Sequence, residues 1–138
     1  MNDEKIRVVM VKPGEHAEVT EITNSLQAMQ DAVGGYIEPV HFSSNPRLVL
    51  ICNEEGKFNG SEPNRALYDD AECQLLDIIY GTFFVCRDCG EDFGSLTDEQ
   101  AKEMEEKFRY PQVWERCGDH FKMTAGGNVM NREIEIWN

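Results

Sequence analysis

The chain has 138 residues, and 26 acidic side chains against 13 lysines and arginines give it a formal net charge of −13. Nucleic acid and anionic lipid repel so acidic a surface, which excludes DNA, RNA and membrane binding as leading functions of this chain alone. The charge favours a partner protein with a basic surface, although acidity that only serves solubility is the alternative.

The number of cysteines and the lack of long apolar segments predict the cellular compartment of the protein. The first five residues are polar and acidic, and the longest apolar run, residues 78–85, is interrupted and too short to cross a bilayer. Five cysteines, an odd number, fit a reducing compartment in which thiols bind metal instead of forming disulfides. We therefore expect a soluble cytoplasmic protein.

The first half of the chain predicts one helix among four strands. Asn24 and Gln27 have the spacing of a capping box, which predicts a helix over residues 25–33 with Gly34 at its end. Alternating and β-branched residues predict the strands on either side of this helix. These strands span residues 5–12, 17–22, 36–42 and 48–52.

The segment between the two halves is harder to interpret. Residues 59–70 are polar and rich in turn formers, so Arg65 is expected to be a solvated loop cation, with a buried or interface cation as the alternative. Residues 75–80 fit either a short helix or a strand, and residues 82–85 fit a core strand.

A second helix and a C-terminal hairpin follow. Thr97 and Gln100 form another capping box, which predicts a helix over residues 98–108. Residues 113–116 resemble a strand, and residues 133–137 alternate as the last strand of a terminal hairpin does. The elements together predict an α+β fold, a mainly antiparallel sheet with two helices and a zinc-bound C-terminal region.

Two pairs of metal-ligating side chains have matching spacing. Cys86 and Cys89 are separated by two residues, as are Cys117 and His120, with 27 residues between the pairs. This pattern is typical of tetrahedral zinc, and four protein ligands leave no open position, so we predict a structural Zn²⁺ site. Reduced cysteines with a coincidental spacing, or a redox pair, are the alternatives.

The predicted zinc site also defines the expected domain organisation. We expect a single compact domain with a core over residues 1–110 and a C-terminal hairpin extension over residues 111–138. The zinc ion would tie the extension to the core, because one pair of ligands lies in each part.

Two acidic clusters are candidates for contact with a basic partner, with a solvated face that has no function as the alternative. One lies on the outward side of the second predicted helix, and the other lies earlier in the chain, at residues 69–72. The first comprises Glu99, Glu103 and Glu106, and the second Asp69, Asp70 and Glu72. A glycine-rich phosphate loop, a nucleophile elbow and a His-Glu-x-x-His motif are all missing from the sequence, so we do not expect an enzyme.

Five short segments occur in order along most of the chain. They are residues 33–38 (VGGYIE), 52–56 (CNEEG), 63–66 (PNRA), 81–85 (GTFFV) and 93–100 (FGSLTDEQ). Over about residues 5–110 the sequence thereby resembles a family of small domains of unknown function found in phages and mobile elements of Firmicutes. The resemblance implies a fold and a context. The four predicted zinc ligands depart from the family's pattern.

This context implies a class of function. Small acidic phage proteins resemble counter-defence inhibitors, including anti-CRISPR proteins that block Cas9. The resemblance thus implies an inhibitor in the bacterial host cytoplasm, a monomer or weak dimer, that binds Cas9 and blocks loading of target DNA. The alternatives are a phage-internal regulatory module and a module that sequesters a nucleotide signal, for which Arg65 and Gly34-Gly35 are the only phosphate-binding candidates.

Overall fold

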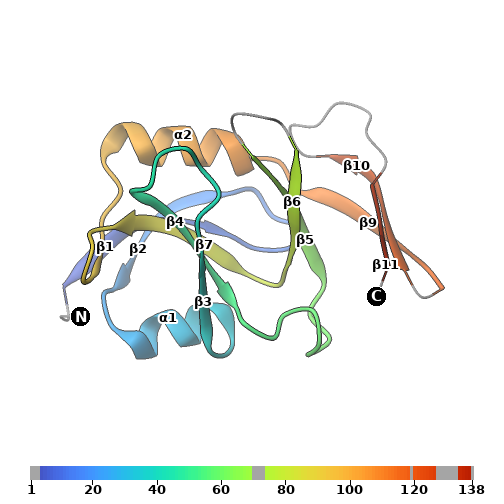
Figure 1. Cartoon of the computed structure of the whole chain (residues 1–138), viewed down its shortest axis with the longest axis horizontal. Helices are drawn as coiled ribbons and strands as arrows, with labels where there is room; N and C mark the ends of the chain where they lie inside the picture. Colours follow the sequence, from blue (N-terminus) through green and yellow to red (C-terminus); the bar gives the residue numbers. More distant parts are fainter. Residues whose placement is uncertain (1–3, 70–73, 119, 127–133, 138) are drawn as a thin grey trace.

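A twisted antiparallel sheet with one helix on each face forms the centre of the molecule, as the computed structural model in Figure 1 shows. The structure describes residues 4–69, 74–118, 120–126 and 134–137. The strands are β1 (Lys5–Val11), β2 (Glu18–Thr23), β3 (Ile37–Val40), β4 (Leu48–Asn53), β5 (Pro63–Tyr68), β6 (Leu75–Tyr80), β7 (Phe83–Asp88), β8 (Phe93–Gly94), β9 (Gln112–Cys117), β10 (His120–Gly126) and β11 (Ile134–Trp137). The helices are α1 (Leu26–Val33) and α2 (Asp98–Phe108).

The strands form three sheets. The central sheet has the order β2-β1-β7-β4-β3, and β8 pairs with the end of β7. The strands β5 and β6 form a separate two-stranded sheet, and β11, β10 and β9 form a third. Every pairing among the described strands is antiparallel, which confirms the predicted α+β fold with a mainly antiparallel sheet and two helices.

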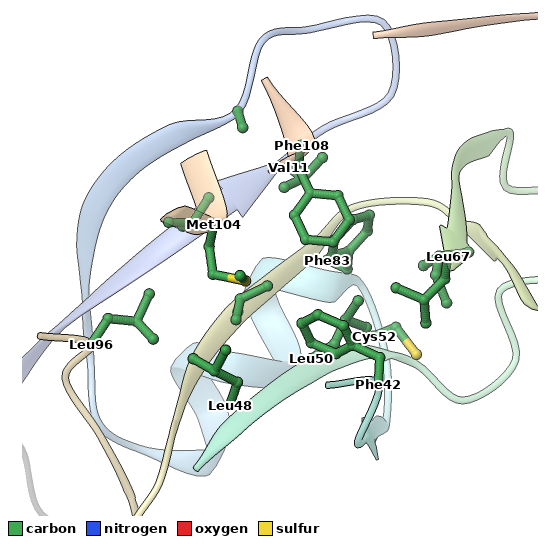
Figure 2. Packing of buried hydrophobic residues seen from close by; sticks show 14 of the residues in the cluster. Val11, Phe42, Leu48, Leu50, Cys52, Leu67, Phe83, Leu96, Met104 and Phe108 are labelled. Carbon is green, nitrogen blue, oxygen red and sulfur yellow. The ribbon is translucent and has the colours of Figure 1, made fainter. Parts of the chain in front are cut away.

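Alternate residues of the central strands supply two separate cores. Phe84 and Cys86 of β7 face α1, whereas Phe83 and Val85 face α2 and the β5–β6 sheet. Figure 2 shows the second of these cores, in which Met104 and Phe108 of α2 contribute to the same cluster as Phe83. Because both faces of the sheet are covered, all six residues of β4 are buried.

The helix boundaries follow from the capping residues. The Thr97 hydroxyl accepts from the amide of Gln100, whose side chain accepts from the Thr97 amide, so the predicted second capping box is confirmed. The predicted N-cap of the first helix, Asn24, was wrong by one residue. The N-cap of α1 is Ser25, whose hydroxyl accepts from the Ala28 amide. The side chain of Asn24 is buried instead and donates to the carbonyl of Phe93.

The largest difference from the prediction concerns residues 63–68, which form strand β5 and not a loop. Arg65 is only 1% exposed, so it is the buried cation and not the solvated one. Its guanidinium donates to the carbonyl of Phe108 at 3.3 and 3.0 Å, to the carbonyl of Glu15 at 2.6 Å, and to Asn64 Oδ1 at 2.8 Å. Burial lowers the pKa of Arg65 to about 10.

The C-terminal sheet packs on the outer face of the β5–β6 sheet. Trp114 and Phe121 contact the cluster of Ala66, Ile78 and Tyr80. Two side chains of β9 also bond the edge of β5: Gln112 Oε1 accepts from the Ala66 amide at 2.7 Å, and Trp114 Nε1 donates to the Asn64 carbonyl at 3.1 Å. Aromatic packing and these hydrogen bonds therefore join the two parts.

No described helix has the length and apolar character that crossing a bilayer requires.

The buried guanidinium predicts a large effect of its removal. Replacing Arg65 with Met should lower the free energy of unfolding by about 2 to 4 kcal/mol, because the carbonyls of Phe108 and Glu15 lose their buried donors. Urea unfolding followed by circular dichroism measures the change. The matched control, Arg47→Met at an exposed position, should stay within about 0.5 kcal/mol of the parent. Equal effects of the two substitutions would contradict the role given to Arg65.

Candidate functional site

The helix α2 presents three acidic side chains to solvent. Its buried positions are Ala101, Met104 and Phe108, which pack against the central sheet. Glu99, Glu103 and Glu106 are all exposed. Because they are spaced by four and three residues, they lie on one side of the helix. We call these three residues the acidic face of α2.

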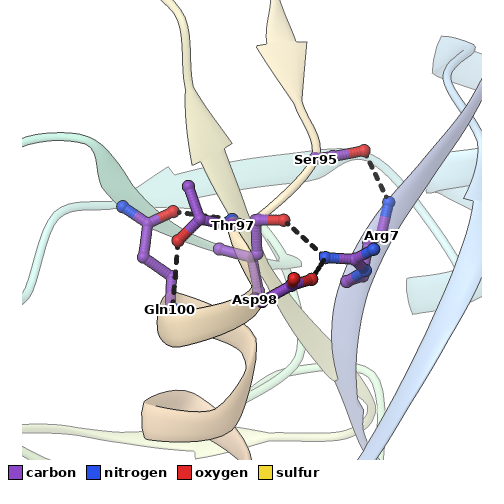
Figure 3. Close-up of polar contacts among 6 residues, drawn as sticks. Arg7, Ser95, Thr97, Asp98 and Gln100 are labelled. Carbon is purple, nitrogen blue, oxygen red and sulfur yellow. Dashed lines mark hydrogen bonds and ion pairs between the residues drawn. The ribbon is translucent and has the colours of Figure 1, made fainter.

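A polar cluster holds the start of α2 against β1 (Figure 3). The Arg7 guanidinium forms an ion pair with Asp98 and donates to the Leu96 carbonyl at 3.4 Å. The Arg7 amide also donates to Ser95 Oγ at 2.9 Å, and the Leu96 amide donates to the Arg7 carbonyl at 3.0 Å. Arg7 was not among the predicted site residues, since an arginine in an alternating strand carries no signal of its partner in sequence.

The other end of α2 is fixed as well. Arg109 donates to both carboxylate oxygens of Glu105, at 2.9 and 2.6 Å, and this hydrogen bonding lowers the pKa of Glu105. Arg65 binds the carbonyl of Phe108 in the last turn, where the helix dipole favours a cation. The acidic face is therefore carried on a helix that is anchored at both ends.

The second acidic cluster is described only in part. Asp69 directly follows β5, and its amide donates to the Gln74 carbonyl at 2.8 Å. Asp70 and Glu72 lie outside the described residues.

The first predicted pair of zinc ligands lies at the end of β7. Cys86 is fully buried among the residues that face α1, and burial is the main cause that raises its pKa. Cys89 is exposed in the turn to β8, where its Sγ lies so close to Gly94 that a Cβ there would be 2.7 Å away.

The second pair lies elsewhere in the molecule. Cys117 ends β9 and pairs in register with His120 at the start of β10, and the side chain of His120 lies outside the described part. Figure 1 places the end of β9 at the right-hand end of the molecule and the end of β7 at the left-hand end. The described residues contain no group of three or more His, Cys, Asp or Glu side chains that could hold a metal. The described residues therefore show no assembled four-ligand site, and zinc binding stays a prediction.

The phosphate-binding candidates of the nucleotide hypothesis are engaged within the protein. The amides of Gly34 and Gly35 both donate to the Gln30 carbonyl at the end of α1, at 2.8 and 3.1 Å. Arg65 is buried and bonded to carbonyl oxygens. Both candidates are therefore already bonded within the protein.

One contact next to the cysteines was not expected. His41 Nε2 lies 2.9 Å from Asp88 Oδ2, between the end of β3 and the end of β7. The amide of Gly90 donates to the other carboxylate oxygen, and this bond, followed by that of His41, lowers the pKa of Asp88. The two residues are far apart in sequence, and only the pairing of β3, β4 and β7 brings them together.

The separation of the two ligand pairs in the structure predicts that the stability of the protein does not depend on metal. Chelator should leave the melting temperature of the full chain unchanged, and Cys117→Ser should alter the free energy of unfolding by no more than about 0.5 kcal/mol, since Cys117 is only half-buried. Cys86→Ser is unsuitable because it buries a hydroxyl in an apolar core whether or not zinc binds. A bound zinc in native mass spectrometry, lost in Cys117→Ser, would show that the turns come together.

Comparison with known proteins identifies a family whose function is unknown. No curated protein matches the chain. No solved structure matches it either. A family model described as "Domain of unknown function (DUF3846)" matches residues 6–109, which span β1 to the end of α2. The chain therefore belongs to this family of domains of unknown function.

Proposed function

We propose that this protein is a binding module that docks the acidic face of α2 on a basic surface of a partner protein. In its specific form, the proposal is a counter-defence inhibitor that binds the CRISPR effector Cas9 and blocks loading of target DNA. The observation that carries it is the set of three exposed glutamates on a helix fixed at both ends. The proposal assigns the chain no chemical step and no metal.

The acidic face is not the main source of the stability of α2. Glu99 and Glu103 are four residues apart, and like charges at this spacing destabilise a helix by a few tenths of a kcal/mol. The capping box and the buried side chains of α2 supply its stability. Only Asp98 and Glu99, in the first turn, gain from the helix dipole.

Cas9 has the complementary chemistry. A guide-loaded Cas9 holds its heteroduplex in a positively charged channel lined by lysines and arginines. The net charge of −13 would speed encounter with such a surface at low ionic strength, and a rigid helix would dock with little loss of conformational entropy. Occupation of the channel would then exclude DNA.

The order of addition tests the inhibitory mechanism. Added to guide-loaded Cas9 before target DNA, the protein should inhibit cleavage, and added after DNA it should not, because the channel is already filled. Inhibition should weaken as salt is raised from 50 to about 300 mM, since salt screens charges that are exposed. No inhibition across several Cas9 orthologues would remove the specific form of the proposal.

Charge reversal tests the surface. Glu99→Lys with Glu103→Lys should weaken binding to the partner by about tenfold or more, because attraction becomes repulsion at the contact. The matched control reverses Glu18 and Glu21, two exposed residues of β2, and changes the net charge equally. Equal losses in the two double variants would mean that only the overall charge matters and that α2 is not the docking surface.

A further inference from the structure

A small crevice opens between the β3 edge of the central sheet and strand β6. The loop that follows β4 closes one side of it. Its volume is about 280 Å³, and α2 contributes no residue to it. The residues that carry its chemistry are Glu38, Cys52, Glu54, Lys57, Phe58 and Asp77.

Negative charge dominates the lining. Among the described lining residues, Glu38, Glu54 and Asp77 bring carboxylates and Lys57 is the one cation. Lys57 Nζ lies 2.5 Å from Asp77 Oδ1, and both side chains are nearly half exposed. An ion pair so open to water is worth little, so another cation can replace the lysine at Asp77.

The floor of the crevice is neutral. Cys52 is 5% exposed, and its thiol donates only a weak hydrogen bond, 3.6 Å long, to the Glu38 carbonyl. Burial first, and then the charges of Glu38 and Asp77, raise the pKa of Cys52 to about 12, so the thiol stays protonated at neutral pH. The carboxylates at the rim are therefore the groups that select the charge of a ligand.

An aromatic side chain stands at the mouth. Phe58 is 88% exposed, the highest value among the large apolar side chains that the structure shows exposed. A phenyl ring beside carboxylates offers a cation both a charged partner and a π face. Carboxylates and the face of an aromatic ring both repel an anion.

The loop that carries Phe58 is folded independently of any ligand. The Glu55 amide donates to Asn53 Oδ1 at 2.8 Å, and the Phe58 amide donates to the Glu55 carbonyl at 2.9 Å. Gly56 lies so close to β6 that a Cβ there would be 2.8 Å from the Tyr80 carbonyl oxygen. The crevice is thus preformed, which lowers the entropic cost of binding.

We propose that this crevice binds one organic cation, an alkylammonium or alkylguanidinium group, which replaces Lys57 at Asp77 and lies against Phe58. The volume fits a group of side-chain size and is below the range usual for sites that hold larger ligands such as nucleotides. The same chemistry is offered by a free polyamine and by a lysine or arginine side chain of another protein. The inference does not depend on the acidic face of α2.

Isothermal titration of the full chain at low salt tests the site, with spermidine, agmatine and N-acetyl-lysine methylamide as probes. Saturable binding of at least one probe is expected. Preference for spermidine would identify a free polyamine as the source, and preference for the lysine derivative a partner side chain. No heat and no amide shifts in the 53–58 and 77–80 segments with any probe would overturn the proposal.

Removal of Lys57 gives the sharpest comparison. Lys57→Gln should tighten binding of the cation several-fold, because it removes the internal competitor for Asp77. Lys102→Gln, an exposed position on α2, changes the net charge equally and should leave the affinity nearly unchanged. Equal gains in the two variants would show non-specific attraction only, and a loss in Lys57→Gln would show that the crevice takes an anion. Either result would overturn the proposal.

Removal of a crevice carboxylate should weaken binding of the cation, the opposite of the effect of removing Lys57. Asp77→Asn should weaken binding by about twofold to fivefold, the range that loss of a half-exposed ion pair gives. In the parent protein, the backbone amide of Ile78 donates to Asp77 Oδ1 at 2.8 Å. The side-chain oxygen of an asparagine can accept the same hydrogen bond, so the fold should persist. Glu38→Gln at the exposed rim is a second variant, with Glu18→Gln on β2 as its control. Unchanged affinity in both crevice variants would contradict the assignment.

Discussion

A buried guanidinium whose described partners are all carbonyl oxygens holds the molecule together. Arg65 lies where the loop after β1, the end of α2 and strand β5 meet, and it bonds a carbonyl oxygen of each of the first two. Its neighbour Asn64 donates to the carbonyls of Val11 and Gly81 and accepts from Arg65. A buried cation is costly unless all its donors are used, so these contacts leave little freedom in how the elements pack.

Asn64 and Ala66, the neighbours of Arg65 in β5, connect the C-terminal sheet to the rest. Trp114 donates to the Asn64 carbonyl, and Gln112 accepts from the amide of Ala66, two positions along β5. These side chains satisfy backbone groups at the edge of β5, which would otherwise be open to pairing with another chain. One segment, residues 64–66, thus fixes α2 on one side and β9 on the other, so the position of the acidic face depends on it.

Local signals predicted the parts of this fold that local chemistry determines. The α2 boundaries follow from Thr97, Gln100 and the apolar stripe, all within eleven residues of one another. Strand β5 was missed because its residues are polar and rich in turn formers, and its strand character comes from pairing with β6. Burial of Arg65 was only the alternative expectation, because its partners lie 43 and 50 residues away in sequence.

The cysteine pairs show the limit of spacing as a signal. Two residues between ligands describe one turn correctly, and such turns do occur after β7 and between β9 and β10. Whether the two turns meet is decided by the sheets that carry them, and Figure 1 shows that these sheets lead them to opposite ends. Spacing within a pair is a local property, whereas a four-ligand site is a tertiary one.

The acidity of the chain has different consequences in the two places considered. On α2 the carboxylates are exposed on a convex helix, so their effect on a partner is long-ranged and screened by salt. In the crevice, Glu38 and Asp77 lie beside a neutral floor, and one of them is already paired with Lys57. Selection there depends on which cation fits and displaces the lysine, and contact chemistry matters more than net charge. A protein with both features can be drawn to a basic surface by the one and can recognise a single cationic group through the other.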